Sequence, residues 1–175
     1  MATVLMDELV QTDYGQFDLV WTEAGGFDGD PDRFFDGQSN GLVGAADPNG
    51  VYVVLARRSG GSPVRVVLHD VEPDLPGPDY DDIVEVSTTV PEDGEPQWSS
   101  WAGETGGDLP GLAPGSYRLR VSARGRDAGA DGEFADEPVD EYLIELWPAG
   151  VAPDTILRVT SQNAAYWHAV WGGRR

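Results

Sequence analysis

Short segments in which apolar and polar residues alternate are the feature of this sequence that most restricts its fold. The alternation recurs in seven segments, at residues 15–21, 51–57, 64–70, 82–88, 116–123, 140–147 and 155–161. A period of two places successive side chains on opposite faces of a β-strand, and 23 Gly and 13 Pro residues supply turns between strands. The pattern therefore predicts an all-β fold, an antiparallel β-sandwich of the jelly-roll kind.

Chain length and apolar content indicate a single domain over residues 1–175. Hydrophobic residues make up 40% of the chain, enough to bury a core, and 175 residues are too few for two comfortable domains. Residues 51–57 and 64–70 flank a Gly-rich connection and are predicted to form a hairpin. One short C-terminal helix is expected over about residues 161–171, where Ser161 caps its start and Gly172 ends it.

Basic residues cluster near the middle of the second half of the chain, although there are only 11 of them. Four lie between positions 112 and 127: Arg118, Arg120, Arg124 and Arg126. Alternation sends Arg118 and Arg120 to the face opposite the apolar side chains, so both are expected to stand outside. If their strand pairs antiparallel with the next one, they face Glu141 and Glu145 and neutralise them. A ligand-facing arginine patch is the alternative.

The charge of the chain is strongly negative, with a formal net value of -20. Phosphate contacts need clustered cations, so direct nucleic-acid binding is not expected and a basic protein partner is favoured. Twelve acidic and no basic residues lie between Arg65 and Arg118, and eight more acids follow over residues 127–145. These runs are either solvated loops or a binding surface. As a surface, the predicted partner-binding residues are Asp79, Asp81, Asp82, Trp98, Trp101, Arg124 and Arg126.

The segment FDGDPDRFFDG has the spacing of a calcium-binding loop. Its aspartates occupy relative positions one, three, five and nine: Asp28, Asp30, Asp32 and Asp36. Alternate carboxylates on a tight loop can converge on a hard cation. Arg33, however, stands where such a loop has Gly, and Ser39 stands where it has the bidentate Glu. An Asp-Gly-rich turn with Asp caps is the alternative that this pattern favours.

Catalytic signatures are missing from the sequence. The chain has no Cys, no Lys and no phosphate loop, which argues against thiol, Schiff-base and Ser-Lys chemistry. His69 and His168 lie far apart, so a zinc site is not expected. The N-terminus lacks a basic region followed by an apolar run, and no segment approaches the roughly 18 apolar residues of a membrane span. We expect a cytoplasmic protein without catalytic activity, membrane association or cofactor, calcium excepted.

The order of several segments resembles the competence protein J family. These are YGQF near the N-terminus, GLVGAADPNGVYVVL, and LAPGSYRLRV followed by DEYLIELWPA, together spanning residues 14–148. The resemblance implies a β-rich inhibitor of a DNA-entry nuclease. The chain departs from the family's namesake in its long acidic segment before Leu109 and in its added C-terminal helix. No family site residue is carried over.

Taken together, the sequence predicts a non-enzymatic acidic binding protein. The favoured role is an inhibitor or immunity-type partner of a basic protein such as a nuclease or a toxin. The alternative is a calcium-dependent carbohydrate-binding module on the same β-sandwich, with loop tryptophans as the surface on which sugars stack.

Overall fold

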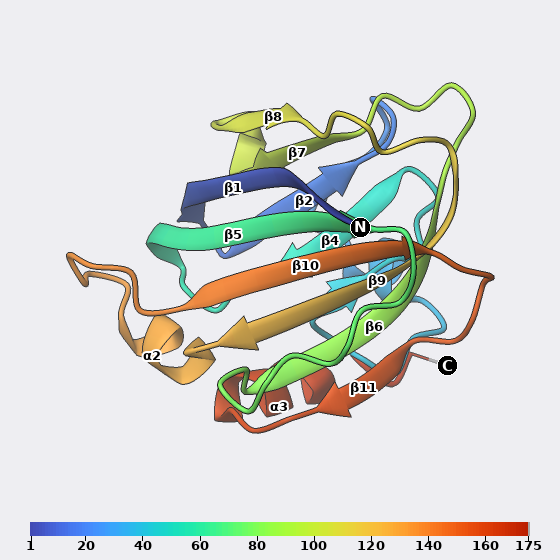
Figure 1. Cartoon of the computed structure of the whole chain (residues 1–175). Helices are drawn as coiled ribbons and strands as arrows, with labels where there is room; N and C mark the ends of the chain where they lie inside the picture. Colours follow the sequence, from blue (N-terminus) through green and yellow to red (C-terminus); the bar gives the residue numbers. More distant parts are fainter. Residues whose placement is uncertain (175) are drawn as a thin grey trace.

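Two β-sheets and a few short helices make up the computed structural model, which describes residues 1–174 (Figure 1). The large sheet has the order β1 (Ala2–Asp13), β5 (Ser59–His69), β10 (Glu141–Pro148), β9 (Gly115–Arg124), β6 (Asp82–Val90) and β11 (Thr155–Arg158). The small sheet has the order β3 (Val43–Gly44), β4 (Gly50–Val54), β2 (Gln16–Val20), β7 (Gln97–Ser100) and β8 (Gly106–Asp108). The predicted β-rich fold is confirmed.

The hydrophobic core lies between the two sheets. Alternation along β9 turns Leu119 and Val121 inward, and β10 adds Ile144. They share one cluster of buried residues with Phe17 and Leu19 of β2, both of which are fully buried. The period of two thus supplies each sheet with one apolar face, and burial of these faces against each other is the main stabilising term.

Two details of the predicted topology are wrong. β10 pairs with β5 in parallel, with Tyr142 opposite Val64 and Leu146 opposite Leu68, so the sandwich is not purely antiparallel. The hairpin predicted from residues 51–57 and 64–70 does not form, because β4 belongs to the small sheet and β5 to the large one. Their connection passes from one layer to the other. Alternation gives the faces of a strand but does not say which sheet receives it.

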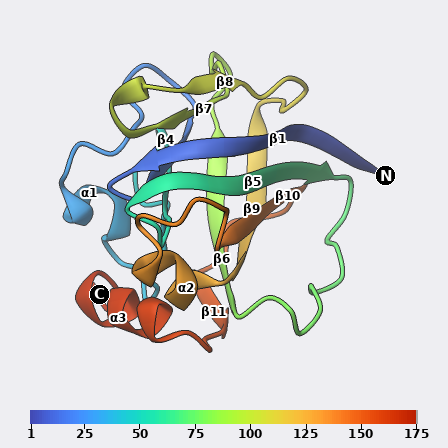
Figure 2. The ribbon, with the colours of Figure 1, turned by 90° about the vertical axis from the view of Figure 1, so that its left-hand side faces the viewer.

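The predicted C-terminal helix is confirmed as α3 (Gln162–Val170), and the Ser161 side chain caps it by accepting a hydrogen bond from the backbone N of Ala164. Three helical segments were not predicted: α1 (Pro31–Phe35), α2 (Arg126–Asp131) and the 3-10 turn η1 (Trp101–Gly103). Each is too short to show a helical apolar period. α2 and α3 lie together at one end of the sandwich (Figure 2). Within residues 1–174, no helix combines the length and apolarity that crossing a bilayer requires.

The connection from β5 to β6, residues 70–81, crosses the outer face of the large sheet, and we call it the strap. β5 and β6 run in the same direction and are separated by β10 and β9, so their connection must span both strands. Figure 2 shows the strap on the side of the large sheet that faces away from the small sheet. It covers what would otherwise be an exposed sheet face.

The predicted pairing of β9 with β10 is confirmed, since Arg120 stands opposite Glu145. The predicted exposure of the arginines is wrong: Arg120 is 1% exposed and Arg118 is 7% exposed. Arg120 donates to Glu85 Oε1 at 2.9 Å and to the strap carbonyl of Pro73 at 3.1 Å, while Arg118 donates to Glu85 Oε2 at 3.2 Å. The strap therefore covers Arg120, which alternation places outside. Arg118 is covered by the chain between β10 and β11, where it donates to the carbonyl of Ala152 at 3.1 Å.

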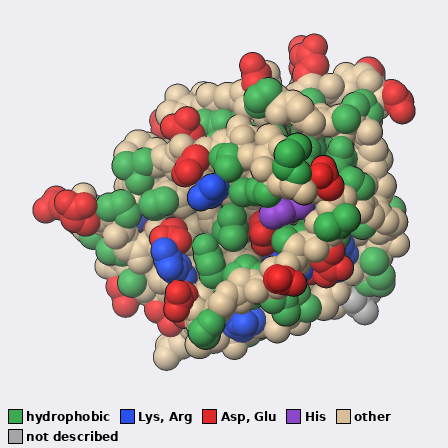
Figure 3. Space-filling view, viewed as in Figure 1, with side chains coloured by type: hydrophobic (Ala, Val, Ile, Leu, Met, Phe, Trp, Pro, Cys, Tyr) green, Lys and Arg blue, Asp and Glu red, His purple; other side chains and the backbone are tan. Residues whose placement is uncertain are grey.

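Burial of these arginines leaves few cations on the surface. Arg57 and Arg126 are also buried, and of the arginines in the described residues Arg58 and Arg65 are the most exposed. On the face shown in Figure 3, acidic side chains project along the left side and the top of the outline, whereas basic ones are few.

Replacing Arg120 with Ala is expected to lower the free energy of unfolding by about 3 kcal/mol, because Glu145 then loses its arginine, Glu85 keeps only Arg118, and the strap carbonyls lose their donor. The matched control is Arg65→Ala on the same sheet face, where the side chain is 53% exposed. It should change stability by no more than about 0.5 kcal/mol. Urea unfolding at pH 7 measures both, and equal effects would contradict the structural role of Arg120.

The docking of α3 depends on a neutral histidine. His168 Nδ1 accepts a hydrogen bond from the backbone N of Gly41 at 3.0 Å, so the ring proton lies on Nε2. Burial lowers the pKa of His168 and the nearby Arg126 adds to this effect, whereas Asp82 and Asp154 oppose it. Protonation would place a second N–H against the Gly41 amide.

We expect His168→Asn to remove part of the acid sensitivity of the protein, because the Oδ1 of the introduced amide can accept the Gly41 hydrogen bond without titrating. In the wild type, the unfolded state binds a proton as the pH falls below about 6.5, and the folded state resists it, so stability declines. Urea midpoints at pH 8 and pH 5 should therefore converge more closely in the variant. His69→Asn serves as the histidine control, and an unchanged pH dependence in His168→Asn would refute the argument.

Candidate functional site

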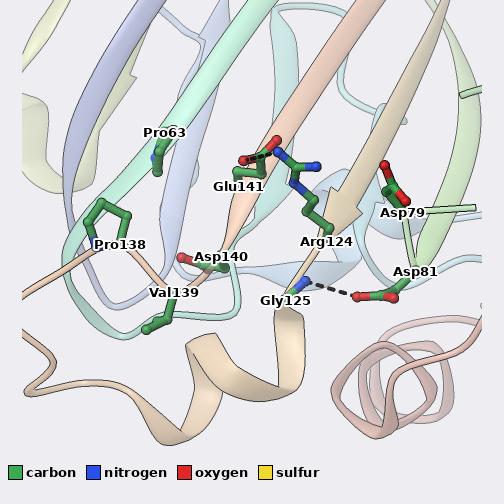
Figure 4. A pocket seen from close by; sticks show the side chains of 9 residues that line it. All are labelled: Pro63, Asp79, Asp81, Arg124, Gly125, Pro138, Val139, Asp140 and Glu141. Atoms are coloured by element: carbon green, nitrogen blue, oxygen red, sulfur yellow. Dashed lines mark hydrogen bonds and ion pairs between the residues drawn. The ribbon is translucent and has the colours of Figure 1, made fainter. Parts of the chain in front are cut away.

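Three of the predicted partner-binding residues, Asp79, Asp81 and Arg124, lie around one pocket where β9 ends and β10 begins (Figure 4). We call it the strand-end pocket. Its volume is about 360 Å³, and its lining consists of Pro63, Asp79, Asp81, Arg124, Gly125, Pro138, Val139, Asp140 and Glu141. The two aspartates come from the end of the strap, so the crossing that buries Arg120 also delivers them to this site.

Arg124 is held in place at the edge of the pocket. The strand register sets it opposite Glu141, and the two side chains form an ion pair at 2.6 Å. The hydrogen bond that Arg124 donates to Glu141 raises the pKa of Arg124 above its usual value. The guanidinium also lies over the ring of Tyr80, 5.5 Å from its centroid. Because the Arg124 side chain is 44% exposed, it remains accessible while its position is fixed.

Asp81 is anchored at the floor by the backbone. Its Oδ2 accepts a hydrogen bond from Gly125 N at 2.9 Å. Gly125 has a φ of 75°, and a Cβ there would lie 2.3 Å from the carbonyl oxygen of Val139, so this position requires glycine. Asp79 stands exposed at the rim without such an anchor.

Asp140 has a structural role in the pocket wall. It is 4% exposed and accepts hydrogen bonds from the hydroxyls of Ser62 and Tyr142, both at 2.6 Å. The accessible carboxylates are therefore those of Asp79, Asp81 and Glu141, against the single cation of Arg124. The pocket is net negative, and its proline and valine wall can pack against the aliphatic part of a cationic side chain.

Two other predicted partner-binding residues, Asp82 and Arg126, hold elements of the fold together. Asp82 is 1% exposed, and its Oδ1 accepts from the backbone N of Thr160 at 2.8 Å and of Ser161 at 3.1 Å, which fixes the start of α3. Arg126, also 1% exposed, donates to the Val54 carbonyl at 2.7 Å. Neither residue lines the strand-end pocket, so neither can contact a partner there. No local pattern indicated that α3 packs over them.

The predicted tryptophan pair lies on the small sheet and not at the strand-end pocket. Trp98 on β7 is 9% exposed and stacks on Phe17, with ring centroids 5.9 Å apart. Trp101 is 37% exposed and packs against Tyr14 at 5.0 Å. Trp98 is thus a core residue, and only Trp101 retains surface for contact.

Sequence reasoning missed Tyr80 and the apolar wall of the pocket. Pro63 and Pro138 are far apart in the chain and meet only because β10 pairs with β5. Local pattern carries no signal for such a pair. The sequence offered one indication: Pro138 lies just before an alternating segment, a position typical of the start of a strand.

Three of the four aspartates of the proposed calcium loop act as turn and cap residues, and the fourth, Asp32, pairs with Arg174. Asp30 caps α1 by accepting from Asp32 N at 3.0 Å, and Asp28 accepts from Asp30 N and pairs with Arg33, both at 3.0 Å. Asp36 ends the helix. In the described part of the chain, no three His, Cys, Asp or Glu side chains gather in a way that could hold a metal. This arrangement leaves the carbohydrate-binding alternative without a calcium site built from these residues.

Millimolar calcium should shift the melting temperature by less than about 1 °C, because a ligand stabilises a protein only when it binds the folded state. Asp30→Ala should lower stability by about 1 kcal/mol through loss of the helix cap, with and without calcium. Thermal unfolding with calcium or with a chelator measures both effects. A calcium shift of several degrees that Asp30→Ala abolishes would restore the calcium-loop interpretation.

Comparisons with known proteins point to one fold. No family model and no curated protein matches the chain. Its structure resembles the crystal structure of ComJ, inhibitor of the DNA degrading activity of NucA, from Bacillus subtilis, with a TM-score of 0.59 and 19% identity over 85% of this chain and 99% of ComJ. It also resembles the crocagin biosynthetic gene J product, with a TM-score of 0.52 and 17% identity over 86% of this chain and 99% of the other. The chain therefore has the fold of ComJ, which confirms the predicted weak resemblance to the competence protein J family at the level of the fold.

Proposed function

We propose that this protein is a non-enzymatic inhibitor that binds a basic protein, a nuclease or a toxin, in the cytoplasm. The observation that carries the proposal is the likeness to ComJ over 85% of the chain, since that protein is an inhibitor of a DNA-degrading activity. The likeness supports a protein-binding role on the same scaffold and does not depend on any catalytic residue.

The distribution of charge supports a basic partner. Twenty of the 31 acidic residues are exposed, whereas the arginines are mostly buried or paired. Nucleases present basic clefts to phosphate groups, and an acidic surface can occupy such a cleft in place of the substrate. The same negative field repels nucleic acid, which favours inhibition by contact with the enzyme over competition for DNA.

The strand-end pocket is the proposed point of contact. Asp79 and Asp81 lie on the strap, Arg124 is fixed beside them, and apolar residues complete the wall. A lysine or arginine of the partner can place its charge near the aspartates and its aliphatic stem against Pro138 and Val139. In this proposal Trp101 supplies a separate aromatic contact from the small sheet.

The proposal predicts that the purified protein binds and inhibits the nuclease or toxin encoded beside it. The Asp79→Asn/Asp81→Asn double variant should slow association about fivefold or more at low salt and change dissociation less, because exposed charges mainly steer encounter. The effect should shrink as salt shortens the Debye length to about 8 Å. The side-chain amide introduced at position 81 can still accept the hydrogen bond from Gly125 N, so the fold should persist.

A charge-matched control removes two exposed carboxylates that lie outside the strand-end pocket, as Glu8→Gln/Asp131→Asn. Stopped-flow binding and a substrate-cleavage assay measure association and inhibition in parallel. If neither binding nor inhibition occurs at low salt, the inhibitor proposal is wrong. If the control slows association as much as the Asp79/Asp81 variant, net charge alone acts and the strand-end pocket is not the contact.

A further inference from the structure

A buried carboxylate on the outer face of the small sheet has no part in the proposed contact. β2 turns Phe17 and Leu19 into the core and Asp18 to the opposite face. Asp18 is nevertheless 1% exposed, because residues from other segments cover this face. The ring of Phe27 stacks on Tyr52 of β4 at 4.0 Å and forms part of this cover.

Asp18 has only neutral hydrogen-bond donors. Gln16 Nε2 donates to Oδ2 at 2.6 Å, and the backbone N of Phe27 donates to Oδ1 at 3.1 Å. No arginine or histidine nitrogen within residues 1–174 forms an ion pair with it. Burial raises the pKa of Asp18 to about 6. An ionised carboxylate has about four acceptor sites, so about two remain unused beside the two hydrogen bonds.

Asp18 lies on the wall of a pocket of about 560 Å³, large enough for a side chain and not only for water. The wall also includes Ser99 of β7 and the exposed carboxylates of Glu23 and Asp28. We call this cavity the Asp18 pocket. The Asp18 pocket differs from a cluster of surface acids, because one carboxylate on its wall, that of Asp18, is almost fully buried.

A second hollow of about 440 Å³ adjoins the Asp18 pocket and shares Val20, Glu23 and Gln97 with it. It adds the carboxylates of Asp93 and Glu95, so the two hollows form one acidic groove across β2 and β7.

One cation lines this groove among the described residues, and it is already neutralised. Arg33 contacts Asp47 at 2.5 Å and Asp28 at 3.0 Å, and it donates to the carbonyl of Ala24 as well. The groove therefore offers carboxylates without offering a free cation.

We propose that the Asp18 pocket binds an arginine side chain of the partner protein, with the guanidinium paired to the Asp18 carboxylate. The source of the arginine rests on the proposed function, whereas the affinity of the pocket for a guanidinium does not. A guanidinium is weakly hydrated and presents two parallel N–H groups to a carboxylate, which suits a buried acceptor better than an ammonium does. Its plane can also pack against the ring of Phe27 on the wall. The outer carboxylates of Glu23, Asp93 and Glu95 then face further basic residues of the same segment.

Two small probes test the pocket without any partner. N-acetyl-arginine amide and N-acetyl-citrulline amide have the same shape, but only the first is charged. In two-dimensional NMR of the ¹⁵N-labelled full chain at pH 7.5, the arginine probe should shift the amides of Asp18, Phe27 and Ser99. The citrulline probe should bind at least about tenfold more weakly, since it lacks the charge.

Asp18→Asn should weaken binding of the arginine probe by about tenfold or more, and Glu8→Gln, an exposed acid outside the groove, should not change it. Ser99→Leu narrows the pocket from β7 while leaving Asp18 intact, so it tests the site even if Asp18→Asn disturbs the fold. Equal binding of arginine and citrulline, or unchanged binding by Asp18→Asn and Ser99→Leu, would overturn the proposal.

The same variants separate this inference from the inhibitor role. If Asp18→Asn weakens partner binding about tenfold or more and also weakens binding of the arginine probe, the result supports an arginine of the partner as the occupant. Partner binding that is unchanged in Asp18→Asn shows that the partner does not use the pocket and overturns the proposed occupant, while the inhibitor role stands. Binding of the arginine probe without any inhibition of a nuclease or toxin refutes the proposed function alone.

Discussion

The rest of the large sheet depends on one interaction, in which Arg118 and Arg120 both donate hydrogen bonds to the carboxylate of Glu85. One carboxylate of β6 receives both guanidiniums of β9, at 3.2 Å and 2.9 Å, and Arg120 then reaches the strap carbonyls of Pro73 and Asp74. The strap can cross the outer face only because these donors satisfy its backbone there. Its far end brings Asp79 and Asp81 to the strand-end pocket, so the geometry of the candidate site is a consequence of an ion pair in the sheet.

Burying cations also determines what the molecule presents to a partner. Arg57 and Arg126 donate to backbone carbonyls, of Gly61 and Val54 respectively, and add no charge to the surface. Of the exposed residues in the described part of the chain, 20 are acidic and 2 are arginines, whereas the whole chain has 31 acidic and 11 basic residues. The folded state tolerates the resulting repulsion, because repulsion between solvated charges is weak.

Much of the fold follows from local pattern, and much of the site does not. Alternation predicted seven of the eleven strands in the described residues and missed β1, β3, β7 and β8. Ser161 marked the start of α3, and opposite charges indicated that Arg120 faces Glu145. Burial of the arginines could not be predicted, because the segments that cover them show no pattern of their own: the strap lies over Arg120, and the chain around Ala152 lies over Arg118. Asp18 was missed for a related reason: an aspartate at an outward position of QFDLV is typical of an exposed residue, and its cover comes from the loop around Phe27.

The parallel pairing of β10 with β5 has a consequence for synthesis and folding. Residues 1–69 can form the β1–β5 ribbon as soon as they leave the ribosome, but the free edge of β5 receives its neighbour only after residue 148 has been made. Contacts this distant in sequence slow folding and prolong exposure of an unpaired apolar edge. The walls of the strand-end pocket meet at the same late step. A chain that ends before β10 would therefore lack both a closed sheet and a complete strand-end pocket, so the pocket takes shape only when synthesis is nearly finished.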